Sequence, residues 1–537
     1  MDYLSEDTFN SRFRLVVLGL LILAGLFIVF ARVVVLAGFS GSYYRELSSG
    51  NRTRQTEIPA NRGIIFDRYD KPLVANLPVF VRQKCSSGKC DREIITKEEA
   101  LLDSNSEAIA ARHYLYGPVL AHVLGYVSLA DRVGVGGVEE IYNRELAGTP
   151  GKELFEVDAT GKKLRSLGKL DQISGEDLHL TIDLNLQQAL YEGLKGVSGA
   201  AVVTIPATGE VLALVSAPPY DPNLFTVLSA DQENREKDIE NVLHNPAQPI
   251  FDRAIGGTFP PGSTFKVITA SAGMESGAIT AATRIEDTGI LVIGPFKFAN
   301  WKWLRGGGTE GVLDLVGAIR RSNDIFFYKV GEMTGLDKIV DMAKRFGLGA
   351  KLGIDLPGEA TGLVPDKAWR EKYAREWYLG DTYHLAIGQG DLLVTPLQVN
   401  AWTAAMANGG KVCRPHVLAG PNDCRDLGLK KETVDLIKKG MGEACSPGGT
   451  GWPLFNYRVK TAEGKEIVVS FSCKTGTAEF GDPKDRTHAW FTAFSQGAVS
   501  STKPQIAITL LIEGGGEGSD VAGPVVKKVL DKWYSRD

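Results

Sequence analysis

The 537-residue sequence has few of the residues that bind metals or nucleic acids. It contains only seven histidines and six cysteines, with no His-Glu-x-x-His motif and no paired-cysteine zinc spacing, so we expect no metal and no other cofactor. The net charge of −4 and the lack of a basic patch interleaved with aromatic residues argue against a nucleic-acid partner. Internal repeats and low-complexity tracts are also absent. The composition, 44% hydrophobic and 23% charged, is that of a globular protein, and the length predicts two or three folded parts.

Long apolar runs are absent except for one near the N-terminus. Residues 15–39 carry a single charge, Arg32, and can span a bilayer if that side chain reaches the interface. A cleavable signal peptide is the alternative, but the apolar run is too long for one and no small-x-small cleavage site closes it promptly. Arg12 and Arg14 precede the run. We therefore expect residues 1–14 in the cytoplasm, a single pass through the inner membrane, and the rest of the chain outside, in the periplasm.

The cysteines would then face an oxidising compartment. Cys85 and Cys90 flank Ser-Ser-Gly-Lys and could close the tip of a hairpin. Three others could contain a second bridge: Cys413, Cys424 and Cys445. Alternation along the strand predicted for Glu466–Lys474 directs Cys473 away from the face that carries Lys474, so we interpret it as a buried free thiol. The sequence leaves the pairing open.

The stretch Phe259–Val267 combines a turn with the start of a helix. Pro260-Pro261-Gly262 forms turns, and the small and apolar residues after it predict a helix to about Glu275. Ser263 and Lys266 are then one helical turn apart on the same face, which suits a serine nucleophile and a lysine that accepts its proton. Ser-x-x-Lys occurs three more times in the chain, so this spacing alone is weak evidence.

Two further motifs follow in a meaningful order. Ser322-Asn323-Asp324 comes next, and then Lys474-Thr475-Gly476-Thr477, which contains the only Lys-[Ser/Thr]-Gly in the chain. A Ser-x-x-Lys, a Ser-x-[Asn/Asp] and a Lys-Thr-Gly in this order are the signature of the penicillin-recognising serine acyl-enzymes.

The arrangement of the predicted elements indicates an α+β fold for residues 176–537. A hairpin of two apolar strands opens this part, mostly helical segments follow up to about Met441, and strands then return before a closing helix. Such an order favours one antiparallel sheet flanked by helices. The predicted strands and closing helix are Gly199–Ile205, Glu210–Ser216, Ile467–Lys474, His488–Phe494, Ile506–Ile512 and Val521–Tyr534. Residues 40–175 are richer in turns, and Gly161–Ser174 is interpreted as a linker.

On these residues the chain resembles a class B penicillin-binding protein, a peptidoglycan D,D-transpeptidase. The resemblance covers nearly everything after residue 39 and implies a β-rich pedestal (the dimerisation-like domain) over 40–175 and the transpeptidase fold over 176–537. Leu73–Pro78 looks more like the elongation-type members, which build the side wall, than the division-type. Besides the three motifs, the matching stretches are Arg62–Arg68, Gly137–Glu139, Thr208–Ala213, Ile387–Gly390, Thr395–Gln398 and His488–Phe491.

The resemblance implies five catalytic residues. Ser263 would attack the carbonyl between the two terminal D-alanines of a stem peptide, and Lys266 would accept its proton. Ser322 and Asp324 would relay protons and hold the substrate amide, while Lys474 would supply positive potential. An amine from a second stem would then take the acyl group and form the cross-link.

The same resemblance implies the substrate-binding residues. The hydroxyl of Thr475 or Thr477 would bind the terminal carboxylate, with Asn323 also assigned to substrate binding. Gly476 would let the substrate backbone approach the strand. Backbone N–H groups of Ser263 and Thr477 would form the oxyanion hole, worth roughly 3–4 kcal/mol per donor.

The sequence departs from the family pattern in two places. The second motif ends in Asp324 rather than the commoner Asn, and an ionised carboxylate there would raise the pKa of Lys266. Only Val79–Arg112 occupies the place where the pedestal usually carries a much larger head, so we expect contacts with a polymerase partner to be reduced there or remade around Cys85–Cys90.

The expected partners follow from the family: stem peptides as substrates, β-lactams as covalent inhibitors, and a SEDS-family membrane glycosyltransferase. The alternatives are a D,D-carboxypeptidase or β-lactamase, in which water takes the acyl group, a β-lactam sensor, and a scaffold that activates the glycosyltransferase. The pedestal and the anchor argue against the hydrolases. The short cytoplasmic tail argues against the sensor, and the three intact motifs argue against a role as scaffold alone.

Overall fold

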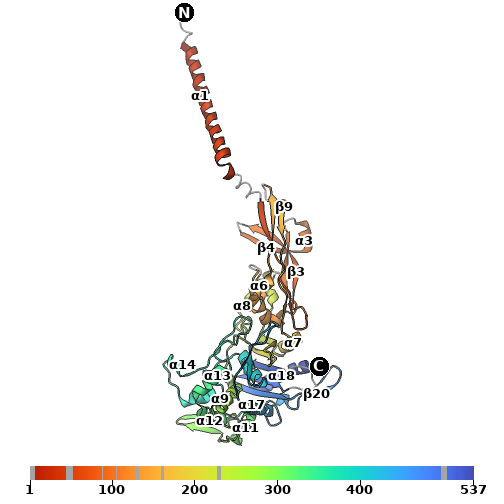
Figure 1. The fold of residues 1–537 in the computed structure, drawn as a ribbon, viewed down its shortest axis with the longest axis vertical. Helices are drawn as coiled ribbons and strands as arrows, with labels where there is room; N and C mark the ends of the chain where they lie inside the picture. Colours follow the sequence, from red (N-terminus) through yellow and green to blue (C-terminus); the bar gives the residue numbers. More distant parts are fainter. Residues whose placement is uncertain are drawn as a thin grey trace. The chain divides into compact units, whose positions relative to one another are not determined.

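The chain forms two compact units, which we describe separately. The N-terminal unit comprises residues 1–61 and 148–175, and the C-terminal unit comprises residues 62–147 and 176–537. The computed structural model (Figure 1) describes residues 6–43, 53–86, 89–103, 106–128, 132–158, 163–226, 232–496 and 505–536.

Much of the segment predicted as pedestal packs within the C-terminal unit. Leu73 and Tyr114 are buried in one hydrophobic cluster with Val211 and Leu397. Since these side chains share a core, residues 62–147 belong to the C-terminal unit by contact, whereas the sequence placed them with the rest of residues 40–175.

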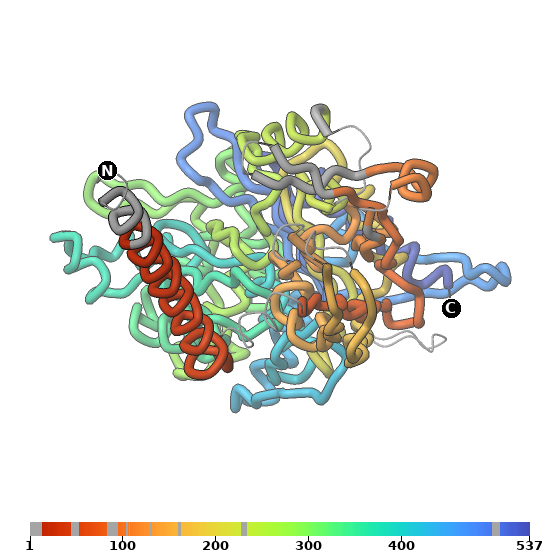
Figure 2. The backbone as a smooth tube through the Cα atoms, turned by 90° about the horizontal axis from the view of Figure 1, so that it is seen from above, coloured from red at the N-terminus to blue at the C-terminus, as the bar shows by residue number. Residues whose placement is uncertain are grey.

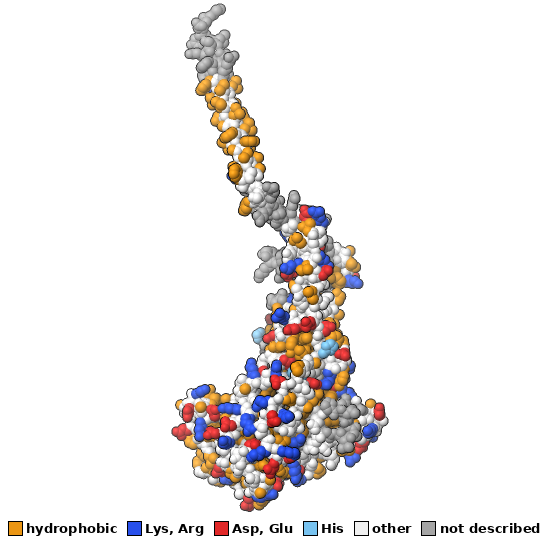
Figure 3. All heavy atoms as spheres, in the orientation of Figure 1, with side chains coloured by type: hydrophobic (Ala, Val, Ile, Leu, Met, Phe, Trp, Pro, Cys, Tyr) orange, Lys and Arg blue, Asp and Glu red, His pale blue; other side chains and the backbone are white. Residues whose placement is uncertain are grey.

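The N-terminal unit begins with a long apolar helix. α1 (Glu6–Val34) continues into one π-helical turn, η1 (Val35–Phe39), and Figure 2 shows α1 as an uninterrupted helix. Phe13–Phe39 is long and apolar enough to cross a membrane, and its apolar side chains are exposed (Figure 3). This agrees with the segment predicted at 15–39.

A small antiparallel sheet completes the N-terminal unit. Its strands are ordered β1-β8-β9, with bounds β1 (Thr53–Ile58), β8 (Gly151–Val157) and β9 (Lys163–Leu170). The prediction of a linker at Gly161–Ser174 is therefore wrong for the residues in β9. The polar composition was misleading because charged side chains of β9 pair with β8, as in Lys163–Glu153 at 2.6 Å.

The head of the pedestal is a second three-stranded sheet, in the C-terminal unit. The order is β4-β3-β5, with bounds β3 (Val74–Ser86), β4 (Lys89–Ile95) and β5 (Ser106–Tyr114), and α3 (Lys97–Leu102) lies between β4 and β5. The register places Cys85 opposite Cys90, as a hairpin requires. The side chains of these two cysteines lie outside the described part of the chain.

A buried ion cluster fixes the base of this head. Glu139 in α5 (Gly137–Ile141) accepts hydrogen bonds from Arg62 Nε at 2.6 Å and from Arg112 Nε at 2.7 Å. The carboxylate is fully buried, and Arg112 also donates to the carbonyl of Gly63 at 2.8 Å. The family-like stretch at Arg62 is thus structural here, with Glu139 as its partner.

The five-stranded central sheet joins the two ends of the catalytic part, as predicted. The order is β12-β11-β23-β22-β21, all antiparallel. The bounds are β11 (Gly199–Thr204), β12 (Val211–Ala217), β21 (Phe471–Glu479), β22 (Thr487–Ser495) and β23 (Ala507–Ile512). Neighbouring residues point to opposite faces, so Leu510 and Leu511 enter different cores.

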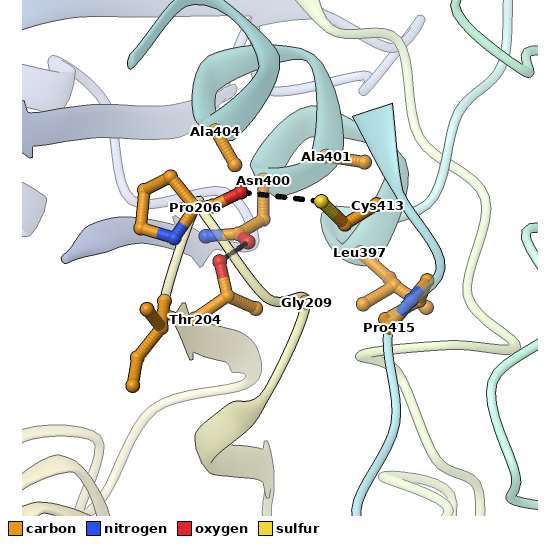
Figure 4. A pocket seen from close by; sticks show the side chains of 10 residues that line it. Thr204, Pro206, Gly209, Leu397, Asn400, Ala401, Ala404, Cys413 and Pro415 are labelled. Atoms are coloured by element: carbon orange, nitrogen blue, oxygen red, sulfur yellow. Dashed lines mark hydrogen bonds between the residues drawn. The ribbon is translucent and has the colours of Figure 1, made fainter. Parts of the chain in front are cut away.

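Helices cover both faces of this sheet. α7 (Leu184–Gly193) and α18 (Gly523–Tyr534) pack in the core that contains Leu510, and α9 (Lys266–Ser276) and α16 (Pro396–Ala407) pack in the other. Asn400 of α16 accepts from the Thr204 hydroxyl at 2.6 Å, beside the contact of Cys413 Sγ with the Pro206 carbonyl (Figure 4). Further helices of the C-terminal unit are α8 (Gln232–Leu243), α11 (Leu315–Arg321), α12 (Asp324–Thr334), α13 (Leu336–Arg345), α15 (Leu379–Ala386) and α17 (Lys431–Ala444).

The strand that carries the third motif differs from its prediction. The expected strand at Ile467–Lys474 is two strands, because β20 (Glu466–Val468) forms its own hairpin with β19 (Arg458–Lys460) before β21 begins. Lys474 to Thr477 therefore lie inside β21, held by β22, rather than at a strand end.

Two disulfides lie among the described cysteines. Cys413–Cys424 joins β17 (Lys411–Cys413) to β18 (Cys424–Asp426), within the predicted set. Cys445–Cys473 joins the end of α17 to β21, with a Cα–Cα distance of 5.6 Å. The interpretation of Cys473 as a free thiol is wrong. Its predicted face is correct, but the C-terminal end of α17 packs on that face and brings Cys445 to it.

Candidate active site

Hydrogen bonds to Phe259 and Pro260 hold the Ser263 turn in place. Phe259 exchanges two 2.9 Å hydrogen bonds with Val394, and Trp490 donates its indole N–H to the Pro260 carbonyl at 2.9 Å. Ser263 lies in η4 (Gly262–Phe265), a 3-10 turn that runs directly into α9 at Lys266. The predicted single helix is thus a 3-10 turn followed by an α-helix, and Ser263 precedes Lys266 by one turn.

Close packing on β21 explains two glycines of the motifs. Gly262 has φ +53°, and a Cβ there would lie 2.9 Å from the Thr477 carbonyl oxygen. A Cβ on Gly476 would lie 3.0 Å from the Pro261 carbonyl oxygen and 3.1 Å from a methyl carbon of Thr264. Gly476 therefore makes room for the Ser263 turn, and its predicted contact with substrate backbone stays a prediction.

Lys266 is fully buried among groups of the second motif. Its amine donates to the Ser322 carbonyl and to Asp324 Oδ1, each at 2.7 Å, and lies 3.4 Å from Ser322 Oγ. The ring of Phe327 lies 5.5 Å away. Among the described residues the Ser263 hydroxyl makes no hydrogen bond, so the amine and the hydroxyl are not yet in contact, as is common before substrate binds.

Burial favours the neutral form of Lys266. Desolvation lowers its pKa below the ordinary 10.5, although the Asp324 carboxylate opposes this effect. The sequence correctly predicted the direction of the Asp324 contribution, but burial outweighs it. The pKa of Lys474 is lowered further, first by burial and then by the nearby positive charge of Lys266. Two amines in one buried site therefore disfavour each other's protonation.

The second motif lies at the junction of α11 and α12. Ser322 ends α11 with φ +53°, a left-handed conformation that turns its hydroxyl toward two lysines. Lys474 donates to Ser322 Oγ at 2.7 Å. Asp324 also accepts from the backbone N–H of Trp301 at 3.0 Å, so its carboxylate connects α12 to α10 (Trp301–Gly306).

Asn323 has a different environment from its neighbours. Its side chain caps α12 by accepting from the Phe326 N–H at 2.8 Å, and it donates to the buried Asp287 at 2.8 Å. Asn323 is fully buried and does not line the pocket described below. Both polar atoms of the Asn323 side chain thus have partners within the protein, and its predicted substrate contact stays a prediction.

Side chains of the third motif contact different parts of the site. Lys474 donates to the Thr475 carbonyl at 2.9 Å as well as to Ser322. The Thr475 hydroxyl donates to Thr450 Oγ1 at 3.0 Å, and the Thr477 hydroxyl donates to Glu517 Oε2 at 3.0 Å. The strand thus presents one buried amine and two threonine hydroxyls.

All three motifs meet in one pocket that is open to solvent. The predicted residues that line it are Ser263, Ser322, Asp324, Thr475 and Thr477. Lys266 and Lys474 lie directly behind Ser322, which both amines contact. Within the described residues no cluster of histidine, cysteine and carboxylate side chains could hold a metal ion. The arrangement suits acyl transfer, with a serine in front of two buried amines.

Sequence reasoning missed several residues of the pocket wall. Arg305, Thr450, Trp452 and Glu517 line the pocket and belong to none of the three motifs. They come from a short helix and from loops, where neither periodicity nor spacing marks a residue as functional. Only their positions beside β21 in the fold reveal them.

Two family models and a curated protein match this chain. A family model of the penicillin binding protein transpeptidase domain matches residues 199–531, and one of the penicillin-binding protein dimerisation domain matches residues 87–180. The chain is similar to the peptidoglycan D,D-transpeptidase MrdA of Haemophilus influenzae, with 33% identity over 99% of this chain and 92% of that protein.

Solved structures show the same likeness. The penicillin-binding protein PBP2 of Helicobacter pylori, in complex with MreC, superposes with a TM-score of 0.76 at 28% identity, over 90% of this chain and 99% of that one. A structure titled "Structural coordination of polymerization and crosslinking by a peptidoglycan synthase complex" superposes with a TM-score of 0.75 at 26% identity. The match covers 98% of this chain and 99% of that one.

Proposed function

Because this chain belongs to the penicillin-binding protein transpeptidases and is a peptidoglycan D,D-transpeptidase of the elongation type, we propose that Ser263 is its nucleophile. The observation that carries the proposal is the convergence of three distant motifs on one pocket, where Lys266 and Lys474 both contact Ser322 beside Ser263. A neutral amine in this position can take the serine proton, and burial favours the neutral form.

The first half-reaction forms an ester. Ser263 Oγ attacks the carbonyl carbon between the two terminal D-alanines while its proton passes to Lys266. Ser322 then passes a proton from the lysines to the leaving nitrogen, the C–N bond breaks, and D-alanine leaves. Backbone N–H groups of Ser263 and Thr477 stabilise the oxyanion, which is worth roughly 3–4 kcal/mol per donor. The hydroxyl of Thr475 or Thr477 holds the terminal carboxylate.

The second half-reaction reverses these roles. An amine of a neighbouring stem peptide attacks the ester carbonyl, loses its proton to the same lysine pair, and releases the Ser263 hydroxyl. The product is an amide cross-link, with the enzyme regenerated. β-Lactams enter as mimics of the first substrate, and their ring-opened ester remains on Ser263 as a covalent block.

We further propose that the chain is anchored by Phe13–Phe39 and works outside the inner membrane. The apolar helix and the arginines that precede it support this orientation. A SEDS-family glycosyltransferase is the partner that would supply glycan strands. A solved relative belongs to a peptidoglycan synthase complex, and another binds MreC, which supports a role within an assembly.

The proposal is tested by labelling the full-length chain in detergent with a fluorescent penicillin, beside Ser263→Ala. We expect a stable label on the wild type and none on the variant. Circular dichroism establishes that the variant is folded. A folded wild type that takes no label would exclude the acyl-enzyme mechanism and favour the scaffold function.

A further inference from the structure

Glu517 places a carboxylate on the hydroxyl that the proposed mechanism assigns to substrate. One of its oxygens accepts from Thr477 Oγ1 at 3.0 Å, and the other forms an ion pair with the guanidinium of Arg305. Arg305 lies in the last turn of α10, and Glu517 directly precedes η6 (Gly518–Ala522). Both residues line the pocket that contains Ser263. The two oxygens of one carboxylate are thus divided between a hydroxyl and a cation at the active site.

We propose that Thr477 and Arg305 together form the receptor for the substrate's terminal carboxylate, and that Glu517 occupies this receptor in the free enzyme. The inference rests on the proposed role of Thr477 and adds two residues that no motif contains. A hydroxyl and a guanidinium are the donors that a carboxylate prefers, because charge-assisted hydrogen bonds are the stronger ones. Glu517 has the same chemical group as the end of the substrate and satisfies the same donors.

Arg305 is held in position relative to the catalytic lysines. Its guanidinium lies 5.3 Å from the ring centre of Trp301, within the range of a cation–π contact. The backbone N–H of Trp301 donates to Asp324, which in turn accepts from Lys266. One chain of contacts therefore links the carboxylate receptor to the proton-accepting amine.

The contact of Glu517 is weak enough to be replaced. The side chains of Arg305 and Glu517 are 57% and 44% exposed, and an ion pair at this exposure is screened by water and salt. A substrate carboxylate entering the pocket exchanges one carboxylate for another at the same donors. A ligand without this group has no means to displace Glu517, so the contact selects for substrates and inhibitors with a free carboxylate.

The test compares acylation of the full-length chain by benzylpenicillin and by its methyl ester, which lacks the free carboxylate. We expect Glu517→Ala to raise the second-order rate constant for the acid about threefold to tenfold, since the competing carboxylate is gone. Arg305→Ala should lower the rate constant for the acid by about the same factor. In the double variant Arg305→Ala with Glu517→Ala, the increase seen in Glu517→Ala alone should disappear. Rates for the ester should change less than about twofold in every variant.

Glu479→Ala is the matched control. Glu479 lines the same pocket, and its replacement by Ala removes the same charge as Glu517→Ala. Among the described residues, however, Glu479 makes no hydrogen bond to Thr477. A rate gain in Glu479→Ala equal to that in Glu517→Ala would mean that charge alone is at work and would overturn the proposal. A slower Glu517→Ala with an unchanged melting temperature, or equal effects on acid and ester, would also overturn it. If the wild type itself is not acylated, the proposed function fails; if it is acylated and the variants do not differ, only this inference fails.

Discussion

Lys266 and Lys474 share one buried site, so their protonation is coupled. Burial lowers the pKa of both, and the charge of Lys266 lowers that of Lys474 further. Asp324 is the carboxylate that opposes these shifts, at 2.7 Å from the Lys266 amine. The apparent pKa that a rate measurement reports belongs to the pair rather than to one lysine.

The pH dependence of acylation follows from this arrangement. The rate should rise with pH as the pair loses its proton, with an apparent pKa below the ordinary lysine value of 10.5. In Asp324→Asn the charge that raises the pKa is removed, so the acidic limb should move to lower pH. Stopped-flow acylation of both proteins across pH measures this shift. An acidic limb that moves to higher pH would contradict the assigned role of Asp324.

At the next scale, β21 is the element that assembles the site. It carries Lys474 and both threonines, packs against the Ser263 turn, and is bonded to the end of α17 through Cys473. The disulfide lies one residue before Lys474. The position of the catalytic amine therefore depends on how firmly α17 holds this strand.

Removing this disulfide should affect both stability and catalysis. We expect Cys445→Ser with Cys473→Ser to lower the free energy of unfolding by about 2–4 kcal/mol. We also expect slower acylation, because β21 loses its attachment beside Lys474. Thermal melting and acylation rates measure the two effects. The matched control, Cys413→Ser with Cys424→Ser, should change stability without changing the acylation rate; an equal loss of rate in both pairs would contradict the role of β21.

The buried cluster at Glu139 gives a prediction for α5 and the head of the pedestal. Glu139→Gln leaves Arg62 and Arg112 beside each other without a counter-charge. Breaking a buried ion pair in this way costs about 3–5 kcal/mol, so we expect local unfolding of the head, seen as faster amide hydrogen exchange in β5. Glu140→Gln, on the exposed side of the same helix, is the control and should leave the exchange unchanged. Unchanged exchange in Glu139→Gln would show that the cluster is not needed.

Some elements of the fold could be predicted from the sequence, and others could not. β22 and β23 are mostly apolar runs that are buried on both faces of the sheet, and their predicted bounds lie within one residue of the observed ones. β21 was misplaced because threonines and a glycine interrupt its apolar pattern. The Cys445–Cys473 pairing and the Arg305–Glu517 contact could not be predicted, since each joins residues that only the packing of loops and helices brings together.

For the whole molecule, the motif order was sufficient to predict the family, and the order of strands and helices was sufficient to predict the sheet. The two units defined by contact differ from the predicted domains at 40–175 and 176–537, which stay a prediction. Residues 62–147 look like part of a separate pedestal in composition, but their apolar side chains share a core with the catalytic part. Substitutions of buried apolar residues in this segment are thus expected to destabilise the transpeptidase fold through that shared core.

The central claim is that Ser263 forms the acyl-enzyme. The most direct measurement is intact and peptide-mapped mass spectrometry of the full-length chain after incubation with benzylpenicillin. We predict a mass increase of one penicillin per chain, with the adduct on the peptide that contains Ser263. An adduct on another residue, or release of D-alanine from a stem peptide by Ser263→Ala, would contradict the account.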